Sequence, residues 1–373
     1  MNPFRYSEPV PPDELIDRDG EARELVDKAF SGTNTRLIAP RRYGKTSLLR
    51  RAMRDARNDG WAAVYVDFFG VLTLADVAAR IELAYAEALE GRLRSWFRGV
   101  QRRLRPTLRV STGEPVPAGV EVSLDPQEET PLLERLALPR SLHERTGVRV
   151  LVVFDEFQDV LAAKDRADAL IRSEIQHHGD AASYVFAGSQ LGMMRALFAD
   201  RRRAMYGQSW PIELPPLDPV DVSDYVADRF ANTNRDPGDT LGPLLDAAQG
   251  HPQRTMLLAH ALWEEVEPRG TATDEDWAAA FDRALGVARD ELRAIWTGIS
   301  TGQRRVLTTI AENTEGLYAG GRRHGGSRGG AVKTAVAALA DLGEIAPDPA
   351  VATGYRVVDP LLRYWIIAGR PGA

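Results

Sequence analysis

The stretch Ala39-Pro40-Arg41-Arg42-Tyr43-Gly44-Lys45-Thr46-Ser47 decides the fold of this 373-residue chain. It follows a short apolar run and precedes a segment with helical spacing. The pattern is G-x-x-x-x-G-K-[ST], with Ala39 in place of the first glycine. In such a loop successive main-chain N–H groups point into one concavity, and the following helix N-terminus adds partial positive charge. The whole stretch therefore predicts a phosphate-binding P-loop.

Side chains of this loop have separate predicted roles. Lys45 can reach the β- and γ-phosphates of a nucleotide, and the Thr46 hydroxyl can bind Mg²⁺. Arg41 and Arg42 add positive charge at the rim. Only four of the 47 basic residues are lysines, yet one stands where phosphate binding needs a slim ammonium. A chance match in an arginine-rich turn is the alternative, and the strand–loop–helix context argues against it.

A second motif follows a continuous apolar run, Leu151 to Phe154, which ends in Asp155 and Glu156. This is a Walker B pattern. Asp155 can hold the Mg²⁺ shell, and Glu156 can orient and deprotonate an attacking water. Both acids would lie at the carboxyl end of a parallel strand, where ligands bind in open α/β sheets. A buried strand that merely ends in a charged loop is the alternative.

Ser189 ends another predicted strand, and its place next to the two motifs predicts a third catalytic group beside Lys45 and Glu156. It could contact the γ-phosphate or the water, with Gln190 as the alternate. The structural alternative is a helix N-cap, a position that serine also favours. An arginine could assist phosphoryl transfer in cis or from a second copy. The candidates for this role are Arg172, Arg195, Arg201, Arg202 and Arg203.

The order of predicted elements indicates an α/β fold with a parallel sheet. The predicted strands are 35–39, 62–68, 149–154, 183–187 and 210–214. Helical patterns separate them, including one long helical stretch from Leu74 into Arg103. A Pro-, Gly- and Glu-rich insertion is expected at about 106–131. The strand signals then stop, so we expect an α/β core at 1–217, a helical bundle at 218–287 and a third unit at 288–373.

Gly250-His251-Pro252-Gln253-Arg254 precedes an apolar helix in the second unit. Proline at the start of a helix is structurally ordinary. The functional alternative is that His251 and Pro252 pack on adenine while Arg254 reaches a phosphate. His251 has no spaced His or Cys partners, so a metal-binding role for it has little support.

Composition limits the classes of function. The formal net charge is −6, so contact with nucleic acid would need a local basic patch. There is no cysteine, which excludes disulfides and thiol chemistry. No apolar run reaches membrane-spanning length and no signal-peptide pattern is present, so we expect a cytoplasmic protein without a membrane partner.

Together these residues resemble the archaeal-type ATPase family, which is close to the AAA+ and STAND superfamilies. The matching pieces are Pro40 to Leu48, Asp155-Glu156-Phe157-Gln158, Gly188-Ser189 with Met193-Met194, Met205-Tyr206-Gly207, Gly250-His251-Pro252 and Tyr355 to Trp365. The resemblance implies an ATP- and Mg²⁺-binding P-loop NTPase core, a helical lid and a C-terminal winged-helix domain. Two departures are Ala39, whose Cβ crowds the turn, and Gln208, which stands where the family often has arginine. Hydrolysis is therefore expected to be slow or to need a partner.

Possible partners follow from the basic segments. The loop at 319–330 carries Arg322, Arg323, His324 and Arg328, and it could follow a DNA phosphate backbone. The expected second helix of the winged domain offers only Lys333, which is thin for a groove reader. Use of the winged helix for protein contact is the alternative. A second basic stretch surrounds Trp96 and Phe97, where an amphipathic helix with its aromatics packed inward is the simpler interpretation. An arginine supplied in trans would require a homo-oligomer.

The leading functional hypothesis is an ATPase that couples Mg-ATP binding and hydrolysis to a conformational switch, acting on DNA or a protein partner. One alternative is a STAND-like, nucleotide-responsive signalling protein with little turnover. Another is a DNA-binding replication or transposition helper.

Overall fold

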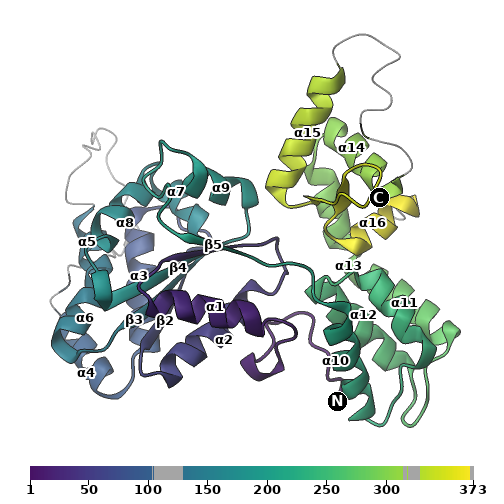
Figure 1. Cartoon of the computed structure of the whole chain (residues 1–373), viewed down its shortest axis with the longest axis horizontal. Coiled ribbons are helices and arrows are strands. Elements are labelled where there is room, and N and C mark those ends of the chain that lie inside the picture. Colours follow the sequence, from purple (N-terminus) through teal and green to yellow (C-terminus); the bar gives the residue numbers. More distant parts are fainter. Residues whose placement is uncertain (103, 105–128, 314–316, 318–327, 370–373) are drawn as a thin grey trace, which may run out of the picture.

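The computed structural model describes residues 1–102, 104, 129–313, 317 and 328–369 (Figure 1). Most of the expected insertion, and the basic loop that follows residue 318, lie outside the described residues. Five strands form a parallel sheet in the order β2-β3-β4-β1-β5. Their bounds are β1 Thr35–Ile38, β2 Ala62–Asp67, β3 Val150–Asp155, β4 Ala182–Gly188 and β5 Trp210–Glu213. The expected parallel sheet is thus confirmed, with strand ends that differ from the predicted ones by about one residue.

The sheet is covered on both faces, which explains its continuous apolar strands. Side chains alternate along β3: Leu151 and Val153 join one hydrophobic cluster, whereas Val152 and Phe154 join another. The first cluster includes residues of α1 (Asp19–Phe30) and α2 (Lys45–Asn58). The second cluster is built mainly with helices from the opposite face. These are α3 (Leu74–Ala88), α4 (Gly91–Gln101), α5 (Thr130–Leu136), α6 (Leu138–Thr146), α7 (Val160–Ala163), α8 (Ala167–Ile175) and α9 (Leu191–Ala199).

One predicted helix is two. The stretch from Leu74 into Arg103 breaks after α3, because Leu89 and Glu90 are extended and Gly91 has a φ of 53°. A positive φ is the conformation that glycine adopts at little cost. In α4 Phe97 is buried and packs against Tyr85, so the aromatics do point inward as the simpler interpretation held.

The chain beyond residue 217 is helical. Its helices are α10 (Pro219–Ala231), α11 (Leu241–Ala248), α12 (Pro252–Glu265), α13 (Asp274–Gly298), α14 (Thr301–Glu312), α15 (Arg328–Leu342) and α16 (Pro360–Ile367). Helix α13 continues through residue 287, where we expected the bundle to end. Between α15 and α16, β6 (Ile345–Pro347) pairs antiparallel with β7 (Tyr355–Val357).

One hydrophobic cluster runs through this whole helical region, from Val222 to Ile366. It also takes in Phe4, which is 1% exposed and packs its ring against Phe230. The N-terminal residues therefore start in the helical region and then cross to the α/β region, an arrangement that the sequence did not indicate. Within the described part of the chain, no helix is both long and apolar enough to span a bilayer.

Candidate nucleotide-binding site

The P-loop connects the end of β1 to the first residue of α2. Arg42 and Gly44 have positive φ values, 62° and 84°. Such turns leave successive N–H groups facing one concavity, and the glycine makes the second turn cheap. Ala39 does not belong to the positive-φ residues, and its methyl group is buried in the core cluster with Leu48. Ala39 therefore does not need the left-handed backbone that favours glycine.

Lys45 lies over this loop. Its Nζ donates to the carbonyl oxygens of Ala39, at 3.3 Å, and Pro40, at 3.5 Å. Burial lowers the pKa of Lys45, and the charges of Glu156 and Asp155 partly oppose this shift. The ammonium is therefore held by main-chain groups of its own loop, within electrostatic reach of both Walker B acids.

Asp155 is 5% exposed at the end of β3. One carboxylate oxygen accepts from the Glu156 N–H at 2.9 Å, and the other accepts from the Tyr65 hydroxyl at 2.5 Å. Burial raises the pKa of Asp155, although the Tyr65 hydrogen bond and the charge of Lys45 pull it down. Tyr65 was missed by sequence reasoning, because its only signal is a polar tip near the end of the neighbouring strand β2.

Glu156 is held from two directions. Its Oε2 accepts from the Ser189 hydroxyl at 2.8 Å, from the Ser189 N–H at 3.2 Å and from Gln158 Nε2 at 2.7 Å. Burial would raise the pKa of Glu156, but these hydrogen bonds and the charge of Lys45 outweigh it and the pKa is lowered. Strand β4, which ends next to Ser189, lies between β1 and β3, as the sequence indicated.

The donor set at this end of the sheet fits a magnesium nucleotide. Thr46 supplies a hydroxyl and Asp155 a carboxylate, which are the hard oxygen ligands that Mg²⁺ takes. The described residues contain no group of three or more His, Cys, Asp or Glu that could hold a metal ion. Because Mg²⁺ is commonly bound by one or two protein groups together with phosphates and water, this sparse set is what a nucleotide-borne metal needs.

A cavity of about 650 Å³ adjoins the P-loop and is lined by Lys45 and Thr46. Its other walls come from the N-terminal segment 5–10, from the start of α12 and from α13. The N-terminal wall is fixed by a hydrogen bond from the Val10 N–H to Ser47 Oγ, at 3.1 Å. Gln253 on α12 donates to the Tyr6 carbonyl at 3.3 Å and so joins two of the walls. The N-terminal segment is thus a candidate part of the binding site, and no sequence motif predicted this.

His251 and Pro252 line different cavities. Pro252 lines the 650 Å³ cavity, whereas His251 does not. The His251 imidazole accepts from the Arg254 N–H as the N-cap of α12 and lies edge-on against Tyr43 of the P-loop. Burial lowers the pKa of His251 to about 4, so the ring is neutral near pH 7. Packing of His251 and Pro252 on adenine stays a prediction.

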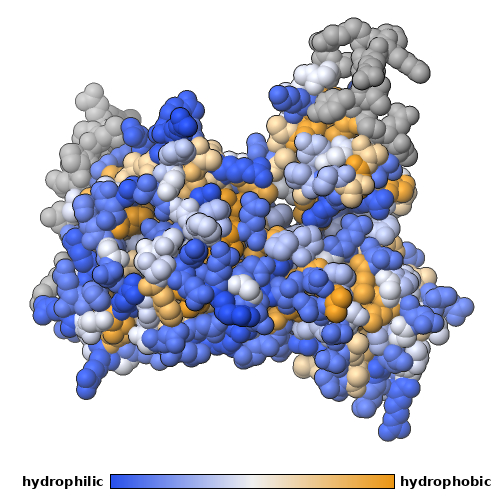
Figure 2. Space-filling view, in the orientation of Figure 1, coloured by the Kyte–Doolittle hydropathy of each residue, from blue (hydrophilic) through white to orange (hydrophobic). Residues whose placement is uncertain are grey.

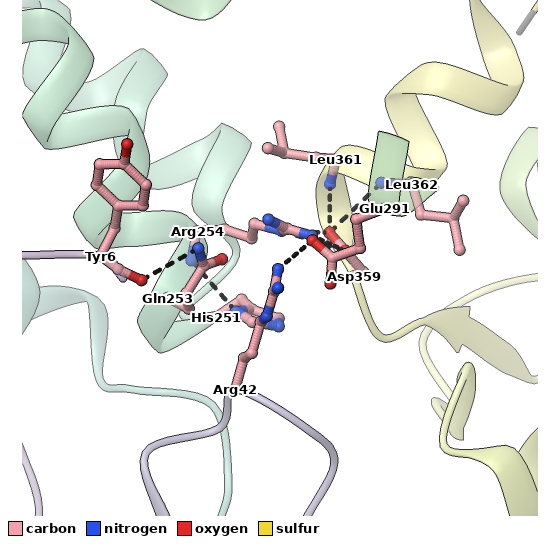
Figure 3. Close-up of polar contacts among 9 residues, drawn as sticks. All are labelled: Tyr6, Arg42, His251, Gln253, Arg254, Glu291, Asp359, Leu361 and Leu362. Atoms are coloured by element: carbon pink, nitrogen blue, oxygen red, sulfur yellow. Dashed lines mark hydrogen bonds and ion pairs between the residues drawn. The ribbon is translucent and has the colours of Figure 1, made fainter. Parts of the chain in front are cut away.

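Arg254 is buried in a charged network with Asp359 and Glu291 (Figure 3). Its Nε and Nη2 donate to Asp359, the N-cap of α16, at 2.5 to 3.1 Å. Nη2 also donates to Glu291 of α13 at 3.0 Å, and Glu291 pairs with Arg42 of the P-loop as well. Burial opposes the charge on Arg254, but Asp359 and Glu291 raise its pKa. Phosphate contact by Arg254 stays a prediction, and it requires these ion pairs to open.

A second cavity, of about 920 Å³, lies beside this network. It is lined by P-loop residues and Ser189 on one side and by the ends of α15 and β7 on the other. The space-filling view shows a notch between the α/β region and the C-terminal helices (Figure 2). The C-terminal region therefore faces the P-loop directly.

No protein-family model and no curated protein matches the sequence. Among solved structures, a Walker-type ATPase of Pyrococcus abyssi is similar over 98% of this chain and 99% of its own, with a TM-score of 0.68 and 17% identity. This chain has the fold of a Walker-type ATPase. The ORC2 protein of Aeropyrum pernix, solved with ADPNP and ADP, is similar over 99% and 98% of the two chains, with a TM-score of 0.55 and 16% identity.

The expected resemblance to archaeal P-loop ATPases is thus confirmed for the fold. The structure brings together Lys45, Asp155, Glu156 and Ser189 at one end of the sheet, as their hydrogen bonds and charges describe. Arg254 also lines the 650 Å³ cavity with Lys45, and His251 lines the second cavity with Ser189. The residues that sequence reasoning missed are Tyr65, Gln158, Glu291 and the N-terminal wall.

Proposed function

We propose that this chain is an ATPase that binds Mg-ATP at the P-loop and hydrolyses it. The observation that supports the proposal most is that Lys45 of the P-loop lies within electrostatic reach of Asp155 and Glu156 at the end of β3. Backbone amides and the ammonium would bind the phosphates, and Thr46 and Asp155 would hold Mg²⁺. When bound, the metal would supply charge neutralisation on the transferred phosphoryl group.

Glu156 would act as the base that orients the attacking water. Its Oε2 accepts three hydrogen bonds from Ser189 and Gln158, and its Oε1 makes none within the described part of the chain. A lowered pKa keeps Glu156 ionised at neutral pH, as a base must be. Ser189 would fix the direction of this carboxylate, and its own contact with the γ-phosphate or the water stays a prediction.

The base of ATP would enter the 650 Å³ cavity. Pro252, Met256 and Leu257 give it an apolar wall on α12. Residues 5–10 of the N-terminal segment line the cavity as well. Cavities of this volume, mostly apolar with a few fixed polar groups, are typical of small-molecule sites.

The test compares phosphate release and ATP binding for the wild type, Lys45→Ala and Glu156→Gln. We expect Lys45→Ala to lose both, and Glu156→Gln to bind ATP while turnover falls. The matched control is Lys164→Ala, an exposed lysine that pairs with Glu129 and lines neither cavity beside the P-loop. Equal rates for the wild type, Lys45→Ala and Glu156→Gln would remove the enzyme assignment.

A second candidate is a nucleotide-responsive switch with little turnover. It is favoured by the C-terminal region, whose Asp359 reaches into the network beside the P-loop. Nucleotide that stays bound through purification without measurable hydrolysis would support this function over steady turnover. Action on DNA through the C-terminal region, which we propose to be a winged helix, stays a prediction. Lys333 is exposed on α15, and the other basic side chains expected there lie outside the described residues.

A further inference from the structure

Arg254 lies between the proposed nucleotide cavity and the C-terminal region. The side chain lines the 650 Å³ cavity together with Arg42 and Lys45. It is nevertheless only 2% exposed, because Asp359 and Glu291 cover its guanidinium. A phosphate therefore cannot reach Arg254 unless at least one of these acids gives way.

Both acids come from outside the α/β region. Glu291 lies in the middle of α13, and Asp359 follows β7 and caps α16 through the N–H groups of Leu361 and Leu362. The same Glu291 oxygen accepts from Arg254 and from Arg42 (Figure 3). Arg42 belongs to the P-loop itself, so one carboxylate joins the loop to the C-terminal helices.

The C-terminal region also packs closely against the α/β region. The end of α15 packs on α9, which follows Ser189. A Cβ placed on Gly192 of α9 would lie 2.6 Å from Asp341 Cβ, and one on Gly343 would lie 3.3 Å from Leu191. An added methyl group at either glycine would thus press on the opposite element, which shows that α9 and the end of α15 lie very close together. We therefore expect the docked position of the C-terminal region and the ion pairs of Arg254 to depend on each other.

We propose that Asp359 and Glu291 are positioning residues that compete with the triphosphate for Arg254 and Arg42, so that ATP binding and docking of the C-terminal region oppose each other. The inference rests on the proposed function, since it assumes ATP in the first cavity. A triphosphate brings several negative charges to the P-loop, and a guanidinium pairs with phosphate as readily as with carboxylate. Release of Arg254 from Asp359 removes the charged tie between α12 and α16.

Four single variants test this competition by calorimetric titration with ATP and with ADP. Asp359→Asn removes the charge but keeps a side-chain oxygen that can cap α16. Glu291→Gln removes the charge of the second acid. Gly192→Ala leaves every charge in place and pushes α9 against Asp341. Asp341→Asn is the control, because this acid lies in the same cleft but pairs with the exposed Arg195 at 3.7 Å.

We expect ATP to bind at least fivefold more tightly to Asp359→Asn, Glu291→Gln and Gly192→Ala than to the wild type. The gain for ADP should be smaller, since ADP lacks the γ-phosphate that Arg254 would contact. Asp341→Asn should stay within twofold. Proteolysis should then cut the C-terminal region of the wild type faster when ATP is present, which a purely structural role of the acids does not predict.

Unchanged ATP affinity in Glu291→Gln and Gly192→Ala, or equal gains for ATP and ADP, would overturn the inference even if Asp359→Asn failed to fold. These outcomes leave the proposed function intact as long as the wild type binds ATP. If the wild type binds no purine triphosphate with Mg²⁺ present, the proposed function itself fails.

Discussion

Two buried cations of this molecule are held in different ways. Lys45 is bound by carbonyl groups five and six residues before it, inside one loop. Arg254 is bound by side chains of Glu291 and Asp359, which are 37 and 105 residues away. The first arrangement exists wherever the P-loop folds. The second exists only when three helices of the C-terminal half are in place, so it can report their position.

The largest expected difference between these two cations is in stability. Arg254→Met leaves Asp359 buried without its cation, which should lower the free energy of unfolding by about 3–5 kcal/mol. Lys45→Met loses two long hydrogen bonds to carbonyl groups and only the longer-range charges of Asp155 and Glu156, so it should cost less, about 1 kcal/mol. Urea denaturation of both variants measures the contrast. The double variant Arg254→Met with Asp359→Asn should recover part of the loss, and equal destabilisation by the two single variants would contradict the comparison.

Catalysis should depend on the way Ser189 fixes Glu156. Ser189→Ala removes a hydrogen bond to a charged carboxylate, and such bonds contribute about 1.5–3 kcal/mol, so kcat should fall about 10- to 100-fold. ATP affinity should hardly change, because the phosphates are bound elsewhere. Ser183→Ala is the matched control: it lies on β4, the strand that leads to Ser189, and its hydroxyl donates to the Ala29 carbonyl at 2.6 Å. Rates of phosphate release that fall equally in both variants would argue against the assigned role.

We expect pH to change the stability of the folded chain through Glu344, which interacts with both acids that pair with Arg254. Burial raises the pKa of Glu344 to about 7, with Asp359 and Glu291 adding to the shift and Arg41 opposing it. The folded chain therefore keeps a proton that the unfolded chain loses above about pH 4.5, and stability falls as the pH rises from there to about 7.

Glu344→Gln should flatten this part of the pH profile and raise stability at pH 8 by about 1–2 kcal/mol, as measured by urea denaturation at pH 5, 6, 7 and 8. The exposed Glu312 provides the control variant, Glu312→Gln, with an unchanged profile. A wild-type stability that rises steadily between pH 5 and 7 and is unaffected by Glu344→Gln would contradict the assignment.

The smallest expected effect is on the metal side of the P-loop. Tyr65→Phe removes the hydroxyl that donates to Asp155 at 2.5 Å. We expect ATP affinity with Mg²⁺ to fall about 3- to 10-fold, the size of one hydrogen bond, while affinity in the presence of EDTA stays the same. Tyr184→Phe, whose hydroxyl contacts His178 at 2.5 Å on the far side of the sheet, should change neither value. Equal losses with and without Mg²⁺ would place the effect outside the metal site.

Local pattern explains what the sequence could predict. The five strands are short apolar runs with turn residues on both sides, and the P-loop and Walker B acids are contiguous in the chain. Tertiary contacts explain the rest. Nothing near Asp359 in the sequence says that its carboxylate meets Arg254, and the capping role of His251 depends on which way α12 leaves its turn. The break between α3 and α4 could not be predicted, because the apolar spacing around Gly91 does not show that this glycine has a positive φ.

Two stretches of chain cross between the α/β half and the helical half, and this limits how the halves can move. The N-terminal segment runs from Phe4, which is buried in the helical half, to Ser47 in the α/β half. Residues 214–218 run from the α/β half back to the helical half. The crossings are tied together where Arg18 Nη2 donates to the Pro215 carbonyl and the Asp218 N–H donates to Asp17, both at 2.6 Å. Two parallel tethers resist twisting far better than one. Any opening of the molecule is therefore expected to be a swing about the line of these crossings, with its widest displacement at α15.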